Sequence, residues 1–508
     1  MPAKLLVIGL DAMEPQLVER WSAEGGMETL ASLTKAGAYG RVSNPSRFYS
    51  GASWPNFWTG MTPDKHQQYL RIRFNAETYN IGAERPEFTC SDPFWTQPAW
   101  SDKRLAIVNM PYNNILNKDI NALQVQDMDV HDRHTQTLRT YPGNVANEIF
   151  DLTGRHKCEI CDRGERTLQE HADFAEELIE RVKRKVKVAE MLLEKEDWDM
   201  FLYCFDECHC AGHIYWHQHD HHNVHYDPKL FALTGNVIKK VYEELDAGIG
   251  RILAMMPSNS NVVVVGSHGM GPAFDPNTIV NELIRRMMGK PHRENNYYVS
   301  KAKRISQFRN VYNNVPGILR NMLQPVKKRF GQGNLDKQRL SELAEMPLFN
   351  FPTNGPMDGI RLNIKGREGH GQPLAEVEKF LERLVEAMSE LTEATTGEPV
   401  FEKLVRFEDE DILNSYDGDL PDYLIQWRRA DAKVLVSPKY GKFRTSVIRG
   451  RSGDHDPAME GFFIASGPYF SHKLHNRPVE LEDFAPTFSR ILNIDNVTSD
   501  GTPICKPN

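Results

Sequence analysis

Residues 5–13, LLVIGLDAM, are an apolar run that ends in an acidic side chain. An unbroken apolar run of this length is typical of a strand buried on both faces of a parallel sheet. Runs of the same kind begin at Arg104 (RLAIVNMPY), Met200 (MFLYCFD), Asn261 (NVVVVGSHG) and Gly461 (GFFIASGP), and helical patterns separate them. The sequence therefore predicts an α/β fold, in which a largely parallel central sheet is flanked by helices on both faces.

The stretch from residue 271 to residue 350 has a different character, with basic helical segments and several Pro and Gly residues. We expect this stretch to be a smaller inserted cap or lid region. The catalytic core is then formed by residues 1–270 and 351–508, and further strands are expected from Gly359 and Asp422.

Composition and charge limit the classes of protein to which the sequence can belong. The net charge of −8 argues against a general nucleic-acid binder, because nonspecific affinity for nucleic acid depends on basic residues. The first apolar run is too short for a signal peptide or a membrane span, so we expect a cytoplasmic protein without a membrane partner. Seven cysteines, an odd number, fit reduced thiols, and the lone CxxC at Cys158 and Cys161 lacks a second pair at zinc-ribbon spacing. The sequence leaves the oligomeric state open.

Polar side chains stand where several predicted strands end. These residues are Asp11, Asp206, Glu207, Ser267 and His268. Ligands of open α/β sheets bind beyond the carboxyl ends of the strands, so we expect these side chains to meet at one edge of the sheet. A helix cap is the alternative interpretation for Asp11.

A dense group of histidines follows the third of these strands, in FLYCFDECHCAGHIYW from Phe201. If the stretch is helical, His209 and His213 share one face at the i, i+4 spacing that suits a metal ion. Cys208 and Cys210 lie off that face. Five further histidines are interpreted as a polar surface: His217, His219, His221, His222 and His225.

Ser53 is the candidate nucleophile. It precedes Trp54-Pro55 and an apolar helical turn, so we expect it near a helix N-terminus with Pro55 in the first turn. Such an end presents free N–H groups and a positive dipole to an incoming phosphate. A plain N-cap serine is the alternative.

Taken in order, these segments resemble the alkaline phosphatase superfamily, in the branch of type I phosphodiesterases and nucleotide pyrophosphatases. The resemblance rests on Gly9-Leu10-Asp11, the stretch from Ser53 to His66, Leu245 to Gly250, His268-Gly269-Met270, Gly366-Arg367-Glu368, Gly453 to His455, and Asp483 to Leu492. It implies an alkaline-phosphatase-like fold and a hydrolase of phosphoric esters.

The resemblance also implies a site with divalent metal ions, commonly Zn²⁺. In such a site Ser53 is the nucleophile that forms a covalent phospho-enzyme, which is then hydrolysed. Asp11, Ser53 and His268 are expected at one ion, and His455 at the other.

Two positions depart from the family pattern. Ser267 stands where the family has an Asp, and His209 stands at another Asp position, so Asp206, Glu207 or His209 is left as the replacement, beside His213. With fewer carboxylates, one of the two sites is expected to be weak or to prefer another metal, such as Mn²⁺ or Fe²⁺.

Substrate choice depends on residues outside the motifs. Asn75, Arg71 and Arg73 are candidates for holding a phosphate oxygen, and the basic stretch 285–329 either contacts the substrate or is a solvated face. We expect a small phosphorylated or nucleotide-like substrate, cleaved at a diester or pyrophosphate bond ahead of a monoester. The alternatives are a phosphoryl or nucleotidyl transferase on the same site, and a degenerate member that binds a phosphorylated ligand without turnover.

Overall fold

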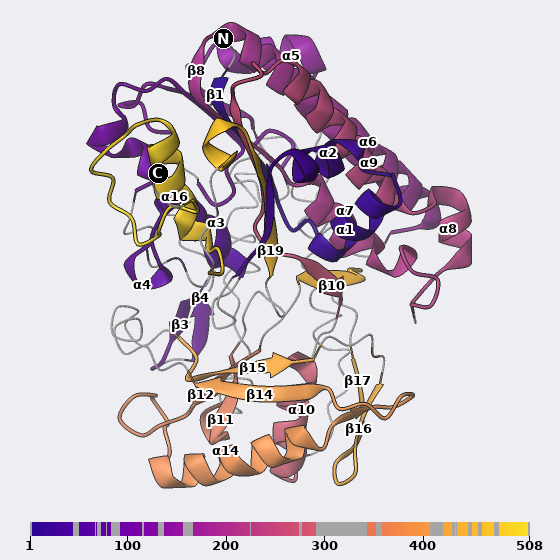
Figure 1. Cartoon of the computed structure of the whole chain (residues 1–508). Helices are drawn as coiled ribbons and strands as arrows, with labels where there is room; N and C mark the ends of the chain where they lie inside the picture. The colour runs from indigo at the N-terminus through magenta and orange to yellow at the C-terminus, as the bar shows by residue number, and fades with distance from the viewer. Residues whose placement is uncertain are drawn as a thin grey trace, which may run out of the picture.

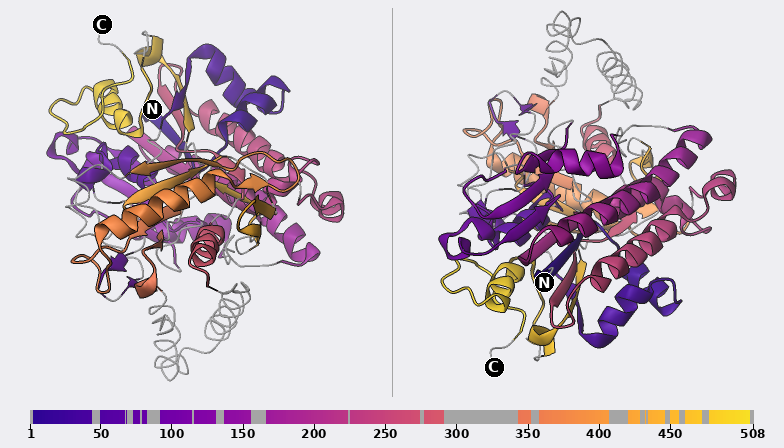
Figure 2. Two further views of the ribbon diagram at one scale, coloured as in Figure 1. Left: turned by 90° about the horizontal axis from the view of Figure 1, so that it is seen from below. Right: turned by 90° about the horizontal axis from the view of Figure 1, so that it is seen from above.

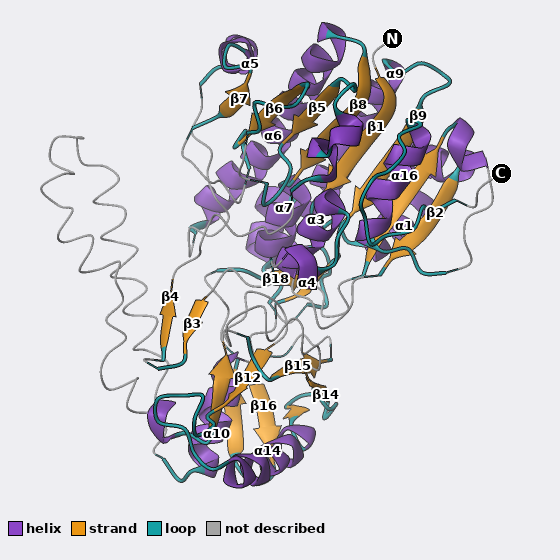
Figure 3. Ribbon diagram, turned by 90° about the vertical axis from the view of Figure 1, so that its left-hand side faces the viewer, coloured by secondary structure: helices purple, strands orange, loops and turns teal. Residues whose placement is uncertain are grey.

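The computed structural model of the chain describes residues 3–43, 50–66, 68, 73–77, 79–82, 92–113, 116–130, 137–155, 166–223, 225–273, 277–290, 343–351, 358–406, 420–428, 432, 434–445, 450–455, 460–471 and 477–505. These residues form a larger α/β part and a smaller part built on separate sheets (Figures 1 and 3). The predicted α/β fold with a mostly parallel central sheet is confirmed. None of the described helices is both long and apolar enough to cross a bilayer.

The larger part is built on an eight-stranded sheet. In order across it lie β2 (Ala38–Val42), β19 (Gly461–Ser466), β9 (Asn261–Gly266), β1 (Ala3–Leu10), β8 (Trp198–Phe205), β5 (Leu105–Val108), β6 (Ala122–Gln126) and β7 (Arg139–Tyr141). The five strands from β9 to β6 are parallel, whereas β19 and β7 run antiparallel to their neighbours. All five apolar runs quoted from the sequence are strands of this sheet.

Both faces of the sheet are buried, as the unbroken apolar runs require. In β1, Leu6, Ile8 and Leu10 belong to one core, whereas Leu5 and Val7 belong to the other. This alternation follows from the two-residue period of a strand.

Helices cover the two faces in different ways. The first core is shared with α1 (Pro15–Ala23), α2 (Glu28–Ala36), α5 (Val145–Thr153), α6 (Leu168–Lys195), α7 (Glu207–Tyr215) and α9 (Val237–Ala254). The second is shared with α3 (Ser50–Thr59), η1 (Phe94–Thr96), η2 (Pro98–Trp100), η6 (Leu481–Asp483) and α16 (Phe484–Ile491). The two long helices α6 and α9 pack side by side (Figure 2). The remaining short elements of the larger part are α4 (Pro63–His66), η4 (Trp216–Gln218), α8 (Pro228–Thr234) and η5 (Pro468–Ser471).

The smaller part has a core of its own. Its antiparallel sheet has the order β11 (Leu348–Phe351), β12 (Asp358–Leu362), β15 (Tyr423–Trp427) and β14 (Phe401–Arg406), and a second sheet joins β13 (Thr392–Glu393), β16 (Val434–Ser437) and β17 (Gly441–Arg444). The helices α10 (Asn277–Met287) and α14 (Leu374–Ser389) contribute to this core. The hairpin of β3 (Arg73–Asn75) and β4 (Asn80–Gly82) packs on it through Phe74 and Tyr79.

The predicted division into a catalytic core and an inserted cap stays a prediction. The strands expected from Gly359 and Asp422 form, but they belong to the smaller part, and the central sheet resumes only with β19. Most of the predicted cap at 271–350, namely residues 274–276 and 291–342, lies outside the described residues. We propose that the inserted region extends from α10 to residue 445, because the described strands in this range, β11 to β17, lie outside the central sheet. The apolar runs alone did not reveal which sheet each strand joins.

Candidate functional site

Asp11 lies directly after β1 and is buried. Its Oδ1 accepts a hydrogen bond from Trp54 Nε1 at 2.7 Å, and its Oδ2 lies 3.1 Å from His209 Nδ1. Burial raises the pKa of Asp11, but the imidazoles of His209 and His268 and the bond from Trp54 outweigh burial and hold the pKa at about 2. The helix-cap alternative is wrong, because α1 is capped by the side chain of Glu14.

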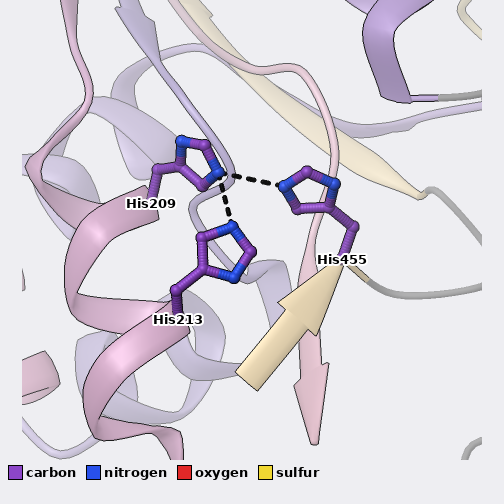
Figure 4. Close-up of side chains that lie close together, drawn as sticks. All are labelled: His209, His213 and His455. Atoms are coloured by element: carbon purple, nitrogen blue, oxygen red, sulfur yellow. Dashed lines mark hydrogen bonds between the residues drawn. The ribbon is translucent and has the colours of Figure 1, made fainter. Parts of the chain in front are cut away.

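Three imidazoles meet beside Asp11, and we call His209, His213 and His455 the histidine cluster (Figure 4). The Nε2 atoms of His209 and His213 lie 2.7 Å apart, and those of His209 and His455 lie 3.1 Å apart. His209 and His213 stand one turn apart on α7, as the sequence predicted. His455 comes from β18 (Gly453–His455), which pairs with β10 (Met270–Pro272) so that His455 is opposite Met270.

The Nε2 atom of His213 presents its lone pair to the histidine cluster. Nδ1 of His213 lies 2.9 Å from the carbonyl oxygen of Gly453, so this nitrogen carries the proton and Nε2 is the acceptor. Burial lowers the pKa of His213 well below its ordinary value, and the charge of Arg451 lowers it further. His213 is therefore neutral at physiological pH, which is the form that binds metals.

His268 approaches the histidine cluster from the end of β9. Its ring lies edge-on to that of His455, with centroids 4.6 Å apart, and its Nδ1 lies 2.8 Å from Ser267 Oγ. Among the described residues its buried Nε2 has no hydrogen-bond partner. Burial lowers the pKa of His268 to about 4, so this imidazole too is neutral and able to accept a cation.

The side chains of Asp206 and Glu207 pair with Lys185 and lie outside the histidine cluster. The ammonium group of Lys185, which is 0% exposed, lies 2.5 Å from Asp206 Oδ1 and 2.7 Å from Glu207 Oε1. Of the three candidates for the missing ligand, His209 is the one in the histidine cluster. The two carboxylates instead balance a buried lysine on α6, which sequence reasoning missed because a lysine in an amphipathic helix has no distinguishing spacing.

Ser53 lies in the first turn of α3 and is buried. The helix starts at Ser50, so Pro55 lies inside it and the prediction that Pro55 lies in the first turn is wrong. Thr59, whose Oγ donates to the carbonyl of Pro55 at 2.7 Å, stabilises the last turn of this helix. The indole of Trp54 ties the turn that carries Ser53 to Asp11.

Two acidic residues of the predicted motifs have structural roles. Asp246 accepts hydrogen bonds from the backbone N–H groups of Thr29 and Leu30, at 2.9 and 2.8 Å, and so holds the start of α2. Asp483 accepts from the backbone N–H of Thr502 at 2.7 Å. Both carboxylates therefore join segments that lie apart in the sequence.

The predicted phosphate-binding residues are not joined to the histidine cluster by the described contacts. Asn75 is exposed at the end of β3, the side chain of Arg73 is not described, and Arg71 lies outside the described residues. Instead Arg451, two residues before Gly453, brings its Nη1 within 3.3 Å of His213 Nε2.

Cys208 donates to the carbonyl of Asp11 at 2.9 Å, away from the histidine cluster. Of the five histidines predicted to form a polar surface, His221 and His222 are exposed beside Asp220, whereas the other three are half-buried: His217, His219 and His225. Cys158 and Cys161 lie outside the described residues.

Known structures share the fold of this chain. Phosphonoacetate hydrolase from Sinorhizobium meliloti 1021 matches in complex with phosphonoformate (13% identity, TM-score 0.53) and with phosphonoacetate (14%, 0.51), with 96% of this chain and 95% of that chain covered in each case. Human ectonucleotide pyrophosphatase / phosphodiesterase 5 gives 13% identity and a TM-score of 0.44, with coverage of 98% and 97%. The first two matches support the alkaline-phosphatase-like fold. No curated protein sequence matches.

A sequence model of one protein family also matches this chain. The model of type I phosphodiesterase / nucleotide pyrophosphatase matches residues 5–429, which hold Asp11, Ser53, the histidines of α7 and His268. The chain therefore belongs to the type I phosphodiesterase / nucleotide pyrophosphatase family within the alkaline phosphatase superfamily, and it is a hydrolase of phosphoric ester bonds.

Proposed function

We propose that this enzyme is a metal-dependent phosphodiesterase or pyrophosphatase in which Ser53 is the nucleophile. One observation carries the proposal: the imidazole nitrogens of the histidine cluster converge beside Asp11, and Trp54 ties Asp11 to the helical turn of Ser53. The expected substrate is a small phosphorylated or nucleotide-like molecule.

The donor set fits a divalent metal ion such as Zn²⁺. Imidazole is a good ligand for zinc, with Zn–N bonds of about 2.0–2.1 Å, so nitrogens in a tetrahedral zinc site lie about 3.3 Å apart. The spacings of 2.7 and 3.1 Å in the histidine cluster are close to this value. Asp11 and the orphaned Nε2 of His268 offer donors for a second ion. A bound cation would polarise the phosphoryl oxygens as a Lewis acid.

The residues of the chain would act in two steps. The Ser53 hydroxyl attacks phosphorus, the leaving group departs with the bonding electrons and ends with the proton of Ser53, and a phosphoryl–serine intermediate forms that keeps the remaining substituent of the substrate. Water then cleaves the bond between phosphorus and Ser53, which restores the hydroxyl and releases the second product. The start of α3 favours the incoming phosphate through its helix dipole. An alcohol in place of water would give the transferase predicted as an alternative, and the cytoplasmic location stays a prediction.

Activity on nitrophenyl mono- and diesters tests the role of Ser53. We expect Ser53→Ala to lower kcat/KM by roughly 10⁴-fold or more, as loss of a covalent nucleophile does. Ser489→Ala, which alters a buried serine on α16, is the matched control and should keep its activity. Equal rates in Ser53→Ala and wild type would remove Ser53 from the mechanism.

Metal content tests the histidine cluster separately. The double variant His209→Ala, His213→Ala should lose at least one equivalent of tightly bound metal, measured by mass spectrometry. His221→Ala, His222→Ala is the control, because these two exposed histidines form with Asp220 the other described group that could hold a metal ion, so the comparison shows which group binds the metal. Unchanged metal content in the first variant would sink the metal assignment, and ligand binding without turnover of any ester by wild type would favour the non-catalytic alternative.

A further inference from the structure

The indole of Trp54 is buried against the first strand of the central sheet, and Trp54 follows the candidate nucleophile directly in α3. A Cβ atom on Gly9 of β1 would lie 2.9 Å from Cη2 of this indole, so glycine leaves room for the ring at this contact. Phe57 meets the ring edge-on, with centroids 5.5 Å apart. The strand and a neighbouring aromatic ring therefore hold the indole in one orientation.

This orientation directs the indole N–H to one oxygen of Asp11. Trp54 Nε1 lies 2.7 Å from Asp11 Oδ1, and the bond is buried. Nε1 of an indole is a donor only, and a hydrogen bond to an ionised acceptor is shorter and stronger than one between neutral groups. The bond therefore fixes the position of Oδ1.

The second oxygen of the same carboxylate faces His209. Asp11 Oδ2 lies 3.1 Å from His209 Nδ1, whereas His209 Nε2 faces the other two nitrogens of the histidine cluster, at 2.7 and 3.1 Å. A neutral imidazole carries one proton, so His209 can offer the lone pair of Nε2 to a cation only when that proton is on Nδ1. Asp11 Oδ2 is the acceptor that favours this tautomer. A carboxylate has further lone pairs, so these contacts do not prevent Asp11 from binding a second ion.

We infer that Trp54 is a positioning residue for the cation of the histidine cluster: its indole N–H fixes the carboxylate of Asp11, which in turn holds His209 in the tautomer that binds metal. This inference rests on the proposed function and adds to it the residue that links the turn of the nucleophile to the metal ligands. Loss of such an outer partner typically lowers metal affinity by roughly 10–100-fold while every ligand stays in place.

The test replaces the indole N–H without removing the ring. Trp54→Phe keeps an aromatic side chain, and Trp58→Phe is the matched control, because Trp58 is also buried, lies one turn further along α3 and donates to the carbonyl of Pro111 at 3.1 Å. The readouts are the affinities for Zn²⁺ and Co²⁺, from competition with a chelator, and the visible spectrum of the Co²⁺ form. We expect Trp54→Phe to bind both ions roughly tenfold or more weakly and to shift the Co²⁺ bands, whereas Trp58→Phe stays within about twofold of wild type.

A double variant tests the route through Asp11. Asp11→Asn should itself weaken Co²⁺ binding, and adding Trp54→Phe to it should cost less than about threefold more, because two residues that act through one contact are not additive. Asp11→Asn leaves the indole in place, so it also serves if Trp54→Phe does not fold, and an unchanged Co²⁺ affinity in Asp11→Asn would then overturn the inference.

The outcomes separate this inference from the proposed function. Equal Co²⁺ affinity in Trp54→Phe and wild type, an equal loss in Trp58→Phe, or additive losses in the double variant would each overturn the role of Trp54 alone. A wild type that binds neither ion would overturn both the metal assignment and the inference. Metal binding that depends on Trp54, in an enzyme whose activity does not depend on Ser53, would support the inference while the proposed nucleophile fails.

Discussion

Replacement of Lys185 by methionine gives the sharpest test of how the site is supported. Lys185 is fully buried, and its ammonium group faces two carboxylates, Asp206 at 2.5 Å and Glu207 at 2.7 Å. Methionine keeps most of the apolar stem but leaves both carboxylates buried without this partner. Removal of one member of a buried ion pair costs about 3–5 kcal/mol, which is a large part of the 5–15 kcal/mol that stabilises a typical protein.

The assay is the free energy of unfolding from urea titration, with Lys183→Met as the matched control. Lys183 lies on the same helix, is 41% exposed and pairs with Glu180 at 2.8 Å, so its loss should cost less than about 1 kcal/mol. Adding Asp206→Asn and Glu207→Gln to Lys185→Met should recover most of the stability, because no buried charge is then left alone. A Lys185→Met protein within 1 kcal/mol of the Lys183→Met protein would refute the reasoning.

Three further predictions follow from single side chains. Burial raises the pKa of Glu482 from 4.5 to about 7, so between these pH values the folded state keeps a proton that the unfolded state has lost. The stability of wild type therefore falls as the pH rises through this window. In thermal unfolding, Glu482→Gln should gain up to about 3 kcal/mol of stability relative to wild type between pH 4.5 and 7.5. Asp246→Ala should destabilise the protein by about 1–2 kcal/mol in urea, because the start of α2 loses two hydrogen bonds. Ser267→Asp should tighten binding of a second divalent cation by roughly tenfold or more in calorimetry, because it adds a carboxylate beside His268, and an unchanged affinity would contradict this expectation.

The framework of the fold was predictable because its signal is local. The five apolar strands and the long helix α6 show their periods directly in the sequence. The sheet to which β12 and β15 belong was not predictable, since the apolar pattern of a half-buried strand is the same in either sheet. Likewise the helical pattern did not reveal that Pro55 lies inside α3.

The residues of the candidate site were likewise predictable only in part. The spacing of His209 and His213 marked them as partners, because four residues make about one helical turn. Arg451 was missed because its position depends on backbone contacts of Ser452 and Gly453 with α7, which no side-chain pattern records. Asp246 matched a family motif and yet serves a neighbouring helix, so a motif match identifies the fold more surely than the chemistry.

The position of β19 in the central sheet sets an order of events during synthesis. The described part of β2 pairs with β19, so the strand that ends at Val42 waits for a partner that begins at Gly461. At about 5–20 residues per second, a ribosome needs roughly 20–80 s to make the intervening chain. The histidine cluster waits nearly as long, because His455 emerges with the same C-terminal segment. A nascent chain therefore exposes a sheet edge and an incomplete histidine cluster through most of its translation.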